Sequence, residues 1–259
     1  MEKGILSKVR KLNWVLQEAP KGVFSFNELC EILGELTDTN VYLSNMNGKI
    51  LGCHLIIKED SNLLMDENKG VEFFPKEYNE EILKITETRA NFSGDEVLKF
   101  FKNEEETKDK IHMLIPVMGG GERCGTLLMT RYDLLFSDED IALAEIGATT
   151  VGIEIQRKKS LEKEESIRNE EVVKMAIGTL SYSENEAVKK IFEELNGLEG
   201  ILVASRIADK SSITRSVIVN ALRKLESAGV IESKSLGMKG THIKVLNDKL
   251  IDVLNEVEN

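Results

Sequence analysis

The spacing of apolar residues near the start of the chain predicts two helices. Ile5, Val9, Leu12 and Leu16 recur at helical spacing and place the first helix near 5–17. The second helix is expected in "SFNELCEILGELTD", where a Ser is followed by a Glu three residues later, the pattern of a capping box. Those two capping residues are Ser25 and Glu28.

Alternating patterns follow, and they predict two β-hairpins. "NVYLSNMNGKILGCHLII" is interpreted as two strands around Asn47-Gly48, a dipeptide typical of tight hairpin turns. "KIHMLIPVM" and "CGTLLMTRYD" are two more strands, joined by "GGGER". Between the hairpins, residues 58–110 are charged and irregular, with few β-branched runs. Two hairpins with flanking helices indicate the α+β class, with an antiparallel sheet and helices packed against it.

A long helical pattern without proline begins at Ser137. Ser137 and Asp140 form a helix start, and the pattern continues to a break at Gly178. The middle, "QRKKSLEKEESIRNEE", is almost entirely charged, which fits either a solvated helical face or a helix between two domains. Because folded patterns lie on both sides, we predict a bridging helix. Small residues in its first part would let it lie close to a neighbour: Ala142, Ala144, Gly147, Ala148 and Gly152.

After Gly178 the order of expected elements is helix, short strand, helix, turn, helix and a two-stranded wing. Ser183 with Glu186 is expected to cap the helix "ENEAVKKIFEEL", which Asn196-Gly197 ends. "GILVASRIADK", a Ser-Ser turn and a further helix come next. "GVIESKS" and "GTHIKVLN" then bracket "LGMKG" as two wing strands. This order predicts a winged helix-turn-helix.

The helix expected from about Thr214 to Ala228 has two different faces. Its apolar positions are spaced to face one core, and Gly229 permits a left-handed cap after it. Those core positions are Val217, Ala221, Leu222 and Leu225. In helix-turn-helix proteins the second helix enters the major groove, where Arg, Asn, Ser and Thr read base edges or bind phosphates. The face opposite the core presents these types: Thr214, Arg215, Ser216, Asn220 and Arg223. DNA binding is therefore predicted, with protein contacts by the winged helix as the alternative.

The distribution of charge supports DNA binding in this segment, although the chain as a whole is acidic. The net charge of the 259 residues is −11, which by itself argues against nucleic acid. Within 206–244, however, the acidic residues are only Asp209, Glu226 and Glu232. A local basic patch is the electrostatic footprint of a DNA-binding domain. The basic residues of the same segment are Arg206, Lys210, Arg215, Arg223, Lys224, Lys234, Lys239 and Lys244.

Membrane and metal sites are not predicted. No apolar run approaches about 18 residues, and the charged N-terminus lacks the apolar stretch of a signal peptide. The expected location is therefore the cytoplasm. Cys30, Cys53 and Cys124 lie far apart and are predicted to be buried free thiols. The histidines are equally scattered, so no metal or bound cofactor is expected: they are His54, His112 and His242.

A nucleotide hydrolase is an alternative from another class, and it rests on "GGERCGT" from Gly120 to Thr126. This stretch lacks the lysine of the phosphate-binding loop G-x-x-x-x-G-K-[ST], and it joins two strands instead of a strand and a helix. No nucleophile–base pair or metal-binding carboxylate accompanies it. The chain is therefore predicted not to be an enzyme, and the Gly-rich segment is predicted to be a hairpin turn.

Several stretches together resemble one family. "ASRIADKSSITRSVIVNALRKLESAGVIESKSLGMKGTHIKVLN", from Ala204 to Asn247, resembles the DNA-binding domain of the CodY family of transcriptional regulators. The resemblance continues through "GTLSYSENEAVKKIFEELNG" and "IPVMGGGERCGTLLMTR" toward the N-terminus. It implies a GAF domain over 1–136, a long linker helix over 137–180 and a winged helix-turn-helix over 181–259. It also implies a homodimer, or a higher oligomer, that acts mainly as a repressor at A/T-rich palindromic operators.

The positions expected to contact double-stranded DNA lie in the helices and wing of the matched stretch. They are Ala204, Ser205, Thr214, Arg215, Ser216, Asn220, Arg223, Lys234 and Lys239.

Members of the family respond to branched-chain amino acids, isoleucine among them, and to GTP. Phe74 and Pro75 match the wall of the amino-acid pocket. The family's arginine for the effector carboxylate has no counterpart, because no arginine occurs between Arg10 and Arg89. "EVLKFFKN" also replaces an aromatic-proline loop of the pocket. A GAF sensor for another small ligand is therefore the alternative.

Three positions match the nucleotide-binding residues of the family, and the resemblance places them where the GAF domain meets the long helix. They are Lys49, Glu154 and Lys159.

Overall fold

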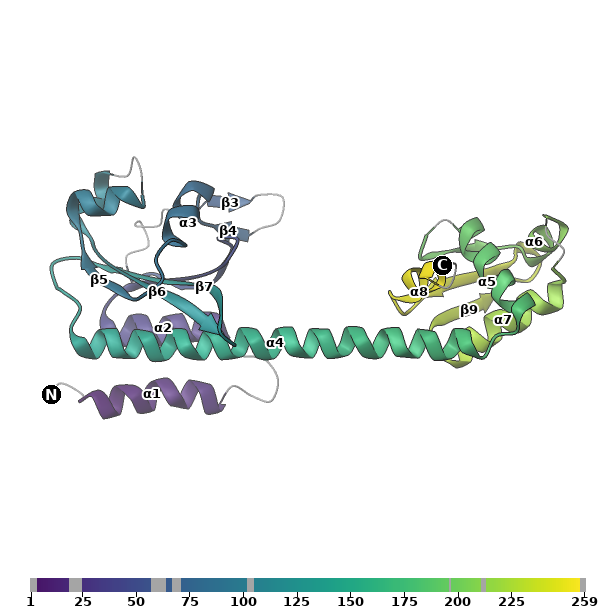
Figure 1. The fold of residues 1–259 in the computed structure, drawn as a ribbon, viewed down its shortest axis with the longest axis horizontal. Helices are drawn as coiled ribbons and strands as arrows, with labels where there is room; N and C mark the ends of the chain where they lie inside the picture. Colours follow the sequence, from purple (N-terminus) through teal and green to yellow (C-terminus); the bar gives the residue numbers. More distant parts are fainter. Residues whose placement is uncertain are drawn as a thin grey trace. The chain divides into compact units, whose positions relative to one another are not determined.

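The computed structural model describes residues 4–18, 25–56, 64–66, 71–101, 105–195, 197–210 and 213–256. The chain forms two compact units, residues 1–159 and 160–259. The helix α4 (Asp138–Gly178) supplies residues to the core of each unit (Figure 1). Among the described helices, none combines the length and the apolar character that a membrane crossing requires.

The first unit is built on an antiparallel five-stranded sheet with strand order β2-β1-β7-β6-β5. The two predicted hairpins are confirmed: β1–β2 turns at Gly48, and β6–β7 turns at Gly120-Gly121. These glycines have φ of +77°, +60° and +83°, a conformation that glycine adopts at little cost. The strands are β1 (Asn40–Asn45), β2 (Ile50–His54), β5 (Arg89–Phe92), β6 (Ile111–Gly119) and β7 (Glu122–Arg131).

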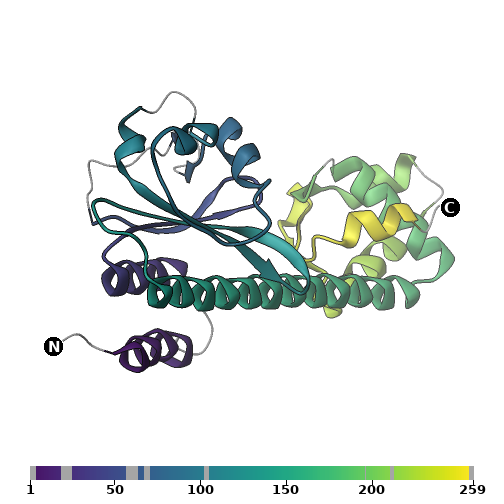
Figure 2. The same ribbon diagram turned by 60° about the vertical axis from the view of Figure 1, so that its left-hand side comes forward.

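Helices cover one face of this sheet. α1 (Ile5–Glu18), α2 (Phe26–Thr37) and the first half of α4 lie on the same side of it (Figures 1 and 2). Both predicted N-terminal helices are thus confirmed, and the N–H of Glu28 donates to Ser25 Oγ at 3.3 Å, as the capping pattern predicted. The core between helices and sheet includes Leu12, Leu29, Leu33, Val41, Leu43, Met113, Leu127, Met129 and Leu143.

The opposite face carries short elements where the sequence predicted an irregular segment. α3 (Lys76–Ile82), β5, the pair β3 (Leu64–Asp66) and β4 (Val71–Phe73), and the 3₁₀ helices η2 (Gly94–Lys99) and η3 (Glu105–Asp109) all lie within 58–110. The prediction is wrong for these residues because elements of three to seven residues show too little of a period to be recognised. Residues of α3, β5 and η2 contribute, with residues of the sheet, to an aromatic cluster on this face: Tyr42, Phe74, Phe92, Phe100 and Phe101, with Ile82, Leu114 and Leu128.

The start of α4 is confirmed by two reciprocal hydrogen bonds. The N–H of Ser137 donates to Asp140 Oδ2 at 3.0 Å, and the N–H of Asp140 donates to Ser137 Oγ at 3.3 Å. Asp140 also pairs with Arg131 at 2.9 Å, and both side chains are buried. The beginning of α4 is therefore tied to the end of β7.

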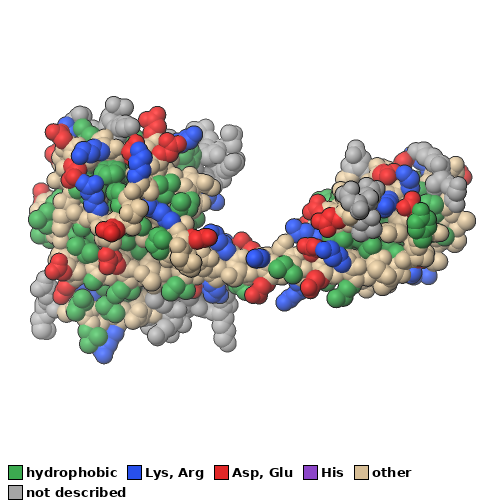
Figure 3. Space-filling model, viewed as in Figure 1, with side chains coloured by type: hydrophobic (Ala, Val, Ile, Leu, Met, Phe, Trp, Pro, Cys, Tyr) green, Lys and Arg blue, Asp and Glu red, His purple; other side chains and the backbone are tan. Residues whose placement is uncertain are grey.

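The small residues of α4 allow close packing, as predicted. A Cβ on Gly147 would lie 2.8 Å from Leu33 Cδ1, and one on Gly152 would overlap the carbonyl of Met118. The middle of the helix, residues 157–165, is exposed throughout. Acidic and basic side chains are interspersed along it (Figure 3).

The second unit is a winged helix-turn-helix, as the order of patterns predicted. A three-stranded sheet of order β8-β10-β9 packs with helices around one core. The last helix was not predicted. The elements are α5 (Tyr182–Leu195), β8 (Glu199–Leu202), α6 (Ala204–Lys210), α7 (Arg215–Ser227), β9 (Ile231–Ser235), η4 (Gly237–Lys239), β10 (Thr241–Val245) and α8 (Leu250–Glu256).

The predicted cap of α5 is wrong by two residues. The N–H of Ser181 donates to Glu184 Oε2 at 2.7 Å, and the N–H of Glu184 donates to Ser181 Oγ at 3.3 Å. Ser181–Glu184 and Ser183–Glu186 have the same spacing, so the capping pattern occurs twice in succession. The packing of the chain after α4 selects the first of them.

Candidate DNA-binding surface and effector face

The helix α7 separates an apolar face from a polar face. Ile218, Ala221, Leu222 and Leu225 are buried in the core of the second unit, and Val217 is only half-buried. The predicted stripe is therefore confirmed, because Val217 also packs against this core, but the prediction omitted the fully buried Ile218. Ile218 follows Val217 directly, and the sequence alone gives no reason to choose between two adjacent β-branched residues.

The opposite face of α7 is exposed, as predicted. Thr214, at the N-cap, has extended backbone angles (φ −77°, ψ 152°), and its side chain forms no capping hydrogen bond. Thr214 Oγ1 lies 2.9 Å from Ser216 Oγ, so both hydroxyls remain at the surface of the first turn. Together with three longer polar side chains they form one exposed face: Thr214, Arg215, Ser216, Asn220 and Arg223.

The other candidate DNA contacts lie on neighbouring elements. Ala204 and Ser205 begin α6, where Ala204 is half-buried and Ser205 is exposed. Lys234 lies on β9 and Lys239 ends η4, and both are exposed on the wing. The candidates thus come from α6, α7 and the wing, the three parts that a helix-turn-helix module with a wing offers to a duplex.

Lys224 differs from the other basic residues of this segment. Its Nζ donates to Glu184 Oε2 at 2.7 Å and to the carbonyl of Thr179 at 3.0 Å. The hydrogen bond from Lys224 holds the pKa of Glu184 below its usual value, and the N–H of Ser181 lowers it further. The count of basic residues along the sequence did not distinguish Lys224 from Arg223.

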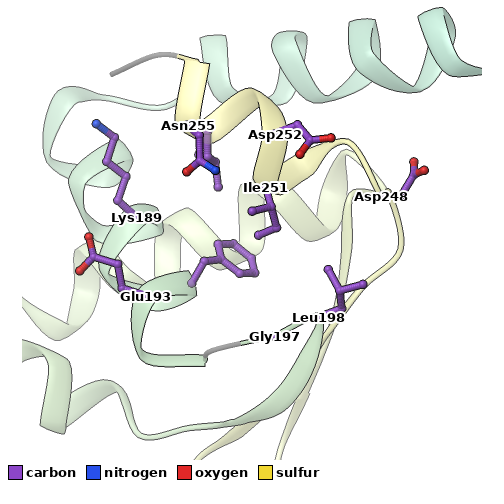
Figure 4. Close-up of a pocket in the computed structure, with 10 residues that line it drawn as sticks. Lys189, Glu193, Gly197, Leu198, Asp248, Ile251, Asp252 and Asn255 are labelled. Atoms are coloured by element: carbon purple, nitrogen blue, oxygen red, sulfur yellow. The ribbon is translucent and has the colours of Figure 1, made fainter. Parts of the chain in front are cut away.

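A second surface of the winged helix-turn-helix is an open cavity of about 540 Å³. Ile251 of α8 points into it (Figure 4), and Phe192 of α5 also lines it. Its charged lining is mainly acidic: Glu193, Asp248 and Asp252, with Lys189. Acidic side chains repel phosphates, so this cavity is unsuited to face DNA.

In the first unit, Phe74 and Pro75, the two residues predicted to form the wall of the effector pocket, directly precede α3. Phe74 is buried in the aromatic cluster, with its ring centroid 6.0 Å from that of Tyr42. Pro75 is half-buried at the N-cap of α3. Apolar aromatic surroundings are suited to the side chain of an apolar amino acid.

Two arginines lie near this cluster, and the sequence had assigned neither. The guanidinium of Arg89 lies over the rings of Phe92 and Phe100, 5.3 and 5.5 Å from their centroids, and it pairs with Glu96. Arg89 and Leu114 are opposite each other in neighbouring strands, which puts Arg89 on the aromatic face of the sheet. The position of Arg89 on an edge strand depends on β5, which the sequence did not reveal.

Arg123, the second arginine, holds neighbouring segments of the chain together through hydrogen bonds. Its guanidinium donates to the carbonyls of Leu83, at 3.0 Å, and Ile85, and to Thr126 Oγ1 at 2.9 Å. Burial lowers the pKa of Arg123. These bonds fix the end of α3 against β7, and they leave few of its donors for a ligand.

His112 is buried beside the same cluster. Its ring centroid lies 5.5 Å from that of Phe92 and 5.4 Å from that of Phe101. Nδ1 lies 3.1 Å from the carbonyl oxygen of Lys110, and burial lowers the pKa of His112 to about 4. His112 is therefore a neutral aromatic member of the core at neutral pH.

The three candidate nucleotide-binding residues do not form one cluster of direct contacts. Lys49 is exposed between β1 and β2, Glu154 pairs with Arg157 at 2.8 Å, and Lys159 is exposed. Among the described residues, none of the three candidates forms a hydrogen bond or ion pair with another. Strand register nevertheless puts the β1–β2 and β6–β7 turns at the same end of the sheet. At that end, Gln156 Nε2 of α4 donates to the carbonyl of Gly119 at 2.9 Å.

The cysteines and the Gly-rich segment show no catalytic arrangement in the described ranges. Cys30 and Cys124 are buried, Cys53 is half-buried, and all three are free thiols. Burial raises the pKa of Cys30 to about 12, which leaves it protonated. Within the same ranges, no three His, Cys, Asp or Glu side chains are grouped to hold a metal ion. "GGERCGT" is part of the β6–β7 hairpin, as predicted.

A GAF-type sheet with an aromatic face, followed by a winged helix-turn-helix, defines a ligand-responsive transcriptional regulator. The CodY GAF-like domain model matches residues 4–179, and the CodY helix-turn-helix domain model matches residues 198–258. The chain belongs to the CodY family. The protein-contact alternative for the winged helix finds no support in these matches.

Relatives match over nearly the whole chain. It is 52% identical over 254 residues to the global transcriptional regulator CodY of Thermoanaerobacter sp. (strain X514), covering 98% of each chain. It is 50% identical over 255 residues to that of Clostridium acetobutylicum, covering 98% of this chain and 99% of the relative. This chain is also similar to a solved structure, the cofactor-binding GAF domain of the nutrient sensor CodY from Clostridium difficile, with 39% sequence identity. The match has a TM-score of 0.50 and covers 60% of this chain and 99% of that one.

Proposed function

We propose that this protein is a global regulator, acting mainly as a repressor, that binds A/T-rich palindromic operators. The observation that carries the proposal is the exposed polar face of α7, from Thr214 to Arg223, opposite a buried apolar face. Such a helix can enter a major groove while its core face holds it on the module. Two half-sites in a palindrome imply a homodimer, or a higher oligomer built from dimers. The proposed location is the cytoplasm, where a bacterial operator is accessible.

Fluorescence anisotropy with a labelled A/T-rich palindromic duplex tests DNA binding. We expect tight binding that weakens steeply with salt, because Lys and Arg release counterions when they bind phosphates. A duplex of the same composition and scrambled sequence is the control for specificity. Equal affinity for the two duplexes at each salt concentration would show that the protein does not recognise the operator sequence.

We further propose branched-chain amino acids and GTP as effectors, with isoleucine in the GAF unit beside Phe74 and Pro75. The support is the aromatic cluster on the face opposite the helices. GTP would bind at the end of the sheet that carries Lys49, and α4 would supply Glu154 and Lys159. Calorimetric titration with isoleucine, valine, leucine and GTP tests each effector separately. Absence of binding at millimolar isoleucine would favour another small ligand.

The carboxylate of an amino-acid effector needs a cationic partner, and we propose Arg89 for this role. An amino acid is a zwitterion, and Arg89 and Glu96 offer the two complementary charges beside Phe92 and Phe100. A planar guanidinium can bind a carboxylate through two parallel hydrogen bonds. We expect Arg89→Gln to weaken isoleucine binding strongly, whereas Arg157→Gln, an exposed arginine of α4, leaves it unchanged. If Arg89→Gln binds isoleucine with unchanged affinity, Arg89 is not the partner of the effector carboxylate.

A further inference from the structure

Lys224 and Arg223 are adjacent on α7 but have different surroundings. Arg223 is exposed on the face that carries the candidate DNA contacts. The Nζ of Lys224 donates to Glu184 Oε2 at 2.7 Å and to the carbonyl of Thr179 at 3.0 Å. An ammonium group has three donor hydrogens, and the side chain of Lys224, although 41% exposed, uses two of them for these acceptors.

The carboxylate that receives Lys224 is itself fixed. The side chain of Glu184 is 10% exposed, and its Oε2 also accepts the N–H of Ser181 at 2.7 Å. Glu184 lies in the first turn of α5, where the helix dipole favours a negative charge. Removal of the ammonium would leave this nearly buried carboxylate without its cationic partner, which is costly in a protein interior.

The other acceptor, Thr179, directly follows the end of α4. The turn there is ordered: the N–H and Oγ1 of Thr179 donate to the carbonyl of Ala176 at 3.2 and 2.7 Å. Lys224 therefore ties α7 both to the last turn of α4 and to the first turn of α5. These three partners, Lys224, Glu184 and Thr179, are called the clasp below.

Apolar packing beside the clasp is incomplete. An open groove of about 560 Å³ lies between the end of α4 and the end of α7. It is lined by Val172, Met175, Ala176, Thr179, Arg223, Lys224, Ser227 and Ala228. Beside this groove, the two helices share the buried core through Ala176 and Leu225, and the hydrogen bond from Lys224 to Thr179 adds a polar contact between them.

We propose that Lys224 is a positioning residue, which sets the place of the recognition helix α7 through Glu184 and Thr179 and contacts no DNA phosphate. Its charge is neutralised by Glu184, so it offers little to a phosphate. The orientation of α7 decides which base edges its polar face meets, and the clasp fixes that orientation relative to the last turn of α4. The inference rests on DNA binding by α7.

The test compares Lys224→Met with Arg223→Met in the full-length protein. Methionine keeps most of the aliphatic chain and removes the charge in both variants. We expect Lys224→Met to weaken operator binding by roughly 5- to 150-fold, the range that a single mismatched base pair causes. Its binding to the scrambled duplex, and the salt dependence of that binding, should equal those of the wild type. Arg223→Met should instead reduce the slope of the logarithm of the binding constant against the logarithm of the salt concentration by about 1 for both duplexes, because one phosphate contact is lost.

Glu184→Gln provides a second, independent variant. It keeps an acceptor for the N–H of Ser181 and removes the charge that holds Lys224. We expect it to reduce the ratio of specific to nonspecific affinity as Lys224→Met does, and the double variant to add little, since both changes break one contact. Thermal unfolding and circular dichroism establish that each variant is folded.

Two outcomes would overturn the proposal. One is a Lys224→Met variant that loses nonspecific affinity and salt slope as Arg223→Met does, because Lys224 would then contact phosphate. The other is operator affinity equal to that of the wild type in both clasp variants. If the wild type itself fails to prefer the operator, the proposed function fails instead, and the two failures are thus distinguishable.

Discussion

At the scale of single residues, helical geometry gives neighbouring side chains of α7 different environments. Successive residues on a helix are about 100° apart, so Ser216 is exposed, Val217 is half-buried and Ile218 is buried. The exposed residues keep their polar groups at the surface, whereas the buried ones hold the helix on the module. Substitutions on the exposed face therefore change binding more than they change stability.

Arg215→Ala is the most direct test of that face. Arg215 is exposed in the first turn of α7, where recognition helices meet base edges. Loss of a bidentate base contact costs roughly 1–3 kcal/mol of binding free energy. We expect operator affinity to fall accordingly in anisotropy titrations, with an unchanged unfolding temperature. Lys190→Ala, which removes an equal charge from α5, is the matched control, and equal behaviour of the two variants would contradict the assignment.

His112 makes the first unit sensitive to acid. Its folded pKa is about 4, below the ordinary value of 6.5, so the folded state binds fewer protons than the unfolded state between these values. Stability should therefore fall as the pH drops from about 6.5 to 4, by up to about 3 kcal/mol for this residue.

His112→Phe keeps an aromatic ring beside Phe92 and Phe101 and removes the titration. Urea unfolding between pH 7 and 4 should show that the wild type loses stability relative to this variant as the pH falls. Parallel curves for the two proteins would show that His112 does not titrate in this way. The chemical shift of the His112 ring, followed in the same range, reports its pKa directly.

At the scale of elements, α4 combines two kinds of surface in one helix. Its first half packs closely on α2 and β6 through small residues, and its middle is exposed. Close approach of a helix to a strand requires that no side chain stand between their backbones. Gly119 and Gly152 meet this condition from both sides, since a Cβ on either would overlap the backbone of the other element.

Gly152→Ala tests this contact. We expect it to destabilise the first unit by roughly 1–3 kcal/mol or more, because the added methyl would push α4 away from Met118. Gly178→Ala at the other end of the same helix is the control, since nothing lies within 4 Å of its Cβ position. Alanine there should be neutral or stabilising by up to about 1 kcal/mol through helix propensity. Equal unfolding midpoints of the two variants would contradict the close contact.

At the scale of the whole molecule, the proposed effector and the operator bind different units. A ligand in the GAF unit can change operator affinity only through its different affinities for two states of the protein. Typical couplings of about 1–3 kcal/mol correspond to roughly 5- to 150-fold in affinity. The helix α4 supplies core residues to both units, among them Val151 in the first and Val173 in the second, and is the covalent route for such coupling.

Thermodynamic reciprocity makes the coupling measurable from either side. If isoleucine tightens operator binding by some factor, saturating operator must tighten isoleucine binding by the same factor. We expect calorimetric titrations of isoleucine into the full chain, with and without operator, to differ by that factor. A scrambled duplex at the same concentration is the control. Equal isoleucine affinities in the presence and absence of operator would rule out the coupling.

Local patterns determined much of this fold before any packing was known. The hairpin at Asn47-Gly48, the capped start of α4 at Ser137 and the two faces of α7 all follow from residues close in sequence. Turn preferences and apolar periodicity act over a few residues, which is why the sequence alone predicted the α+β class and the winged helix-turn-helix. The exposure of Arg215 and Asn220 followed from the same periodicity.

Tertiary structure decided what depends on residues far apart in the chain. It selected Ser181 over Ser183 as the cap of α5, although both have an acidic residue three positions later. It placed Arg89 over the aromatic cluster, and it paired Lys224 with Glu184, 40 positions away. Side-chain charge is a property of the sequence. Whether a charge meets solvent, a ligand or a buried partner is set by packing, because only the folded chain brings such distant residues within hydrogen-bond distance.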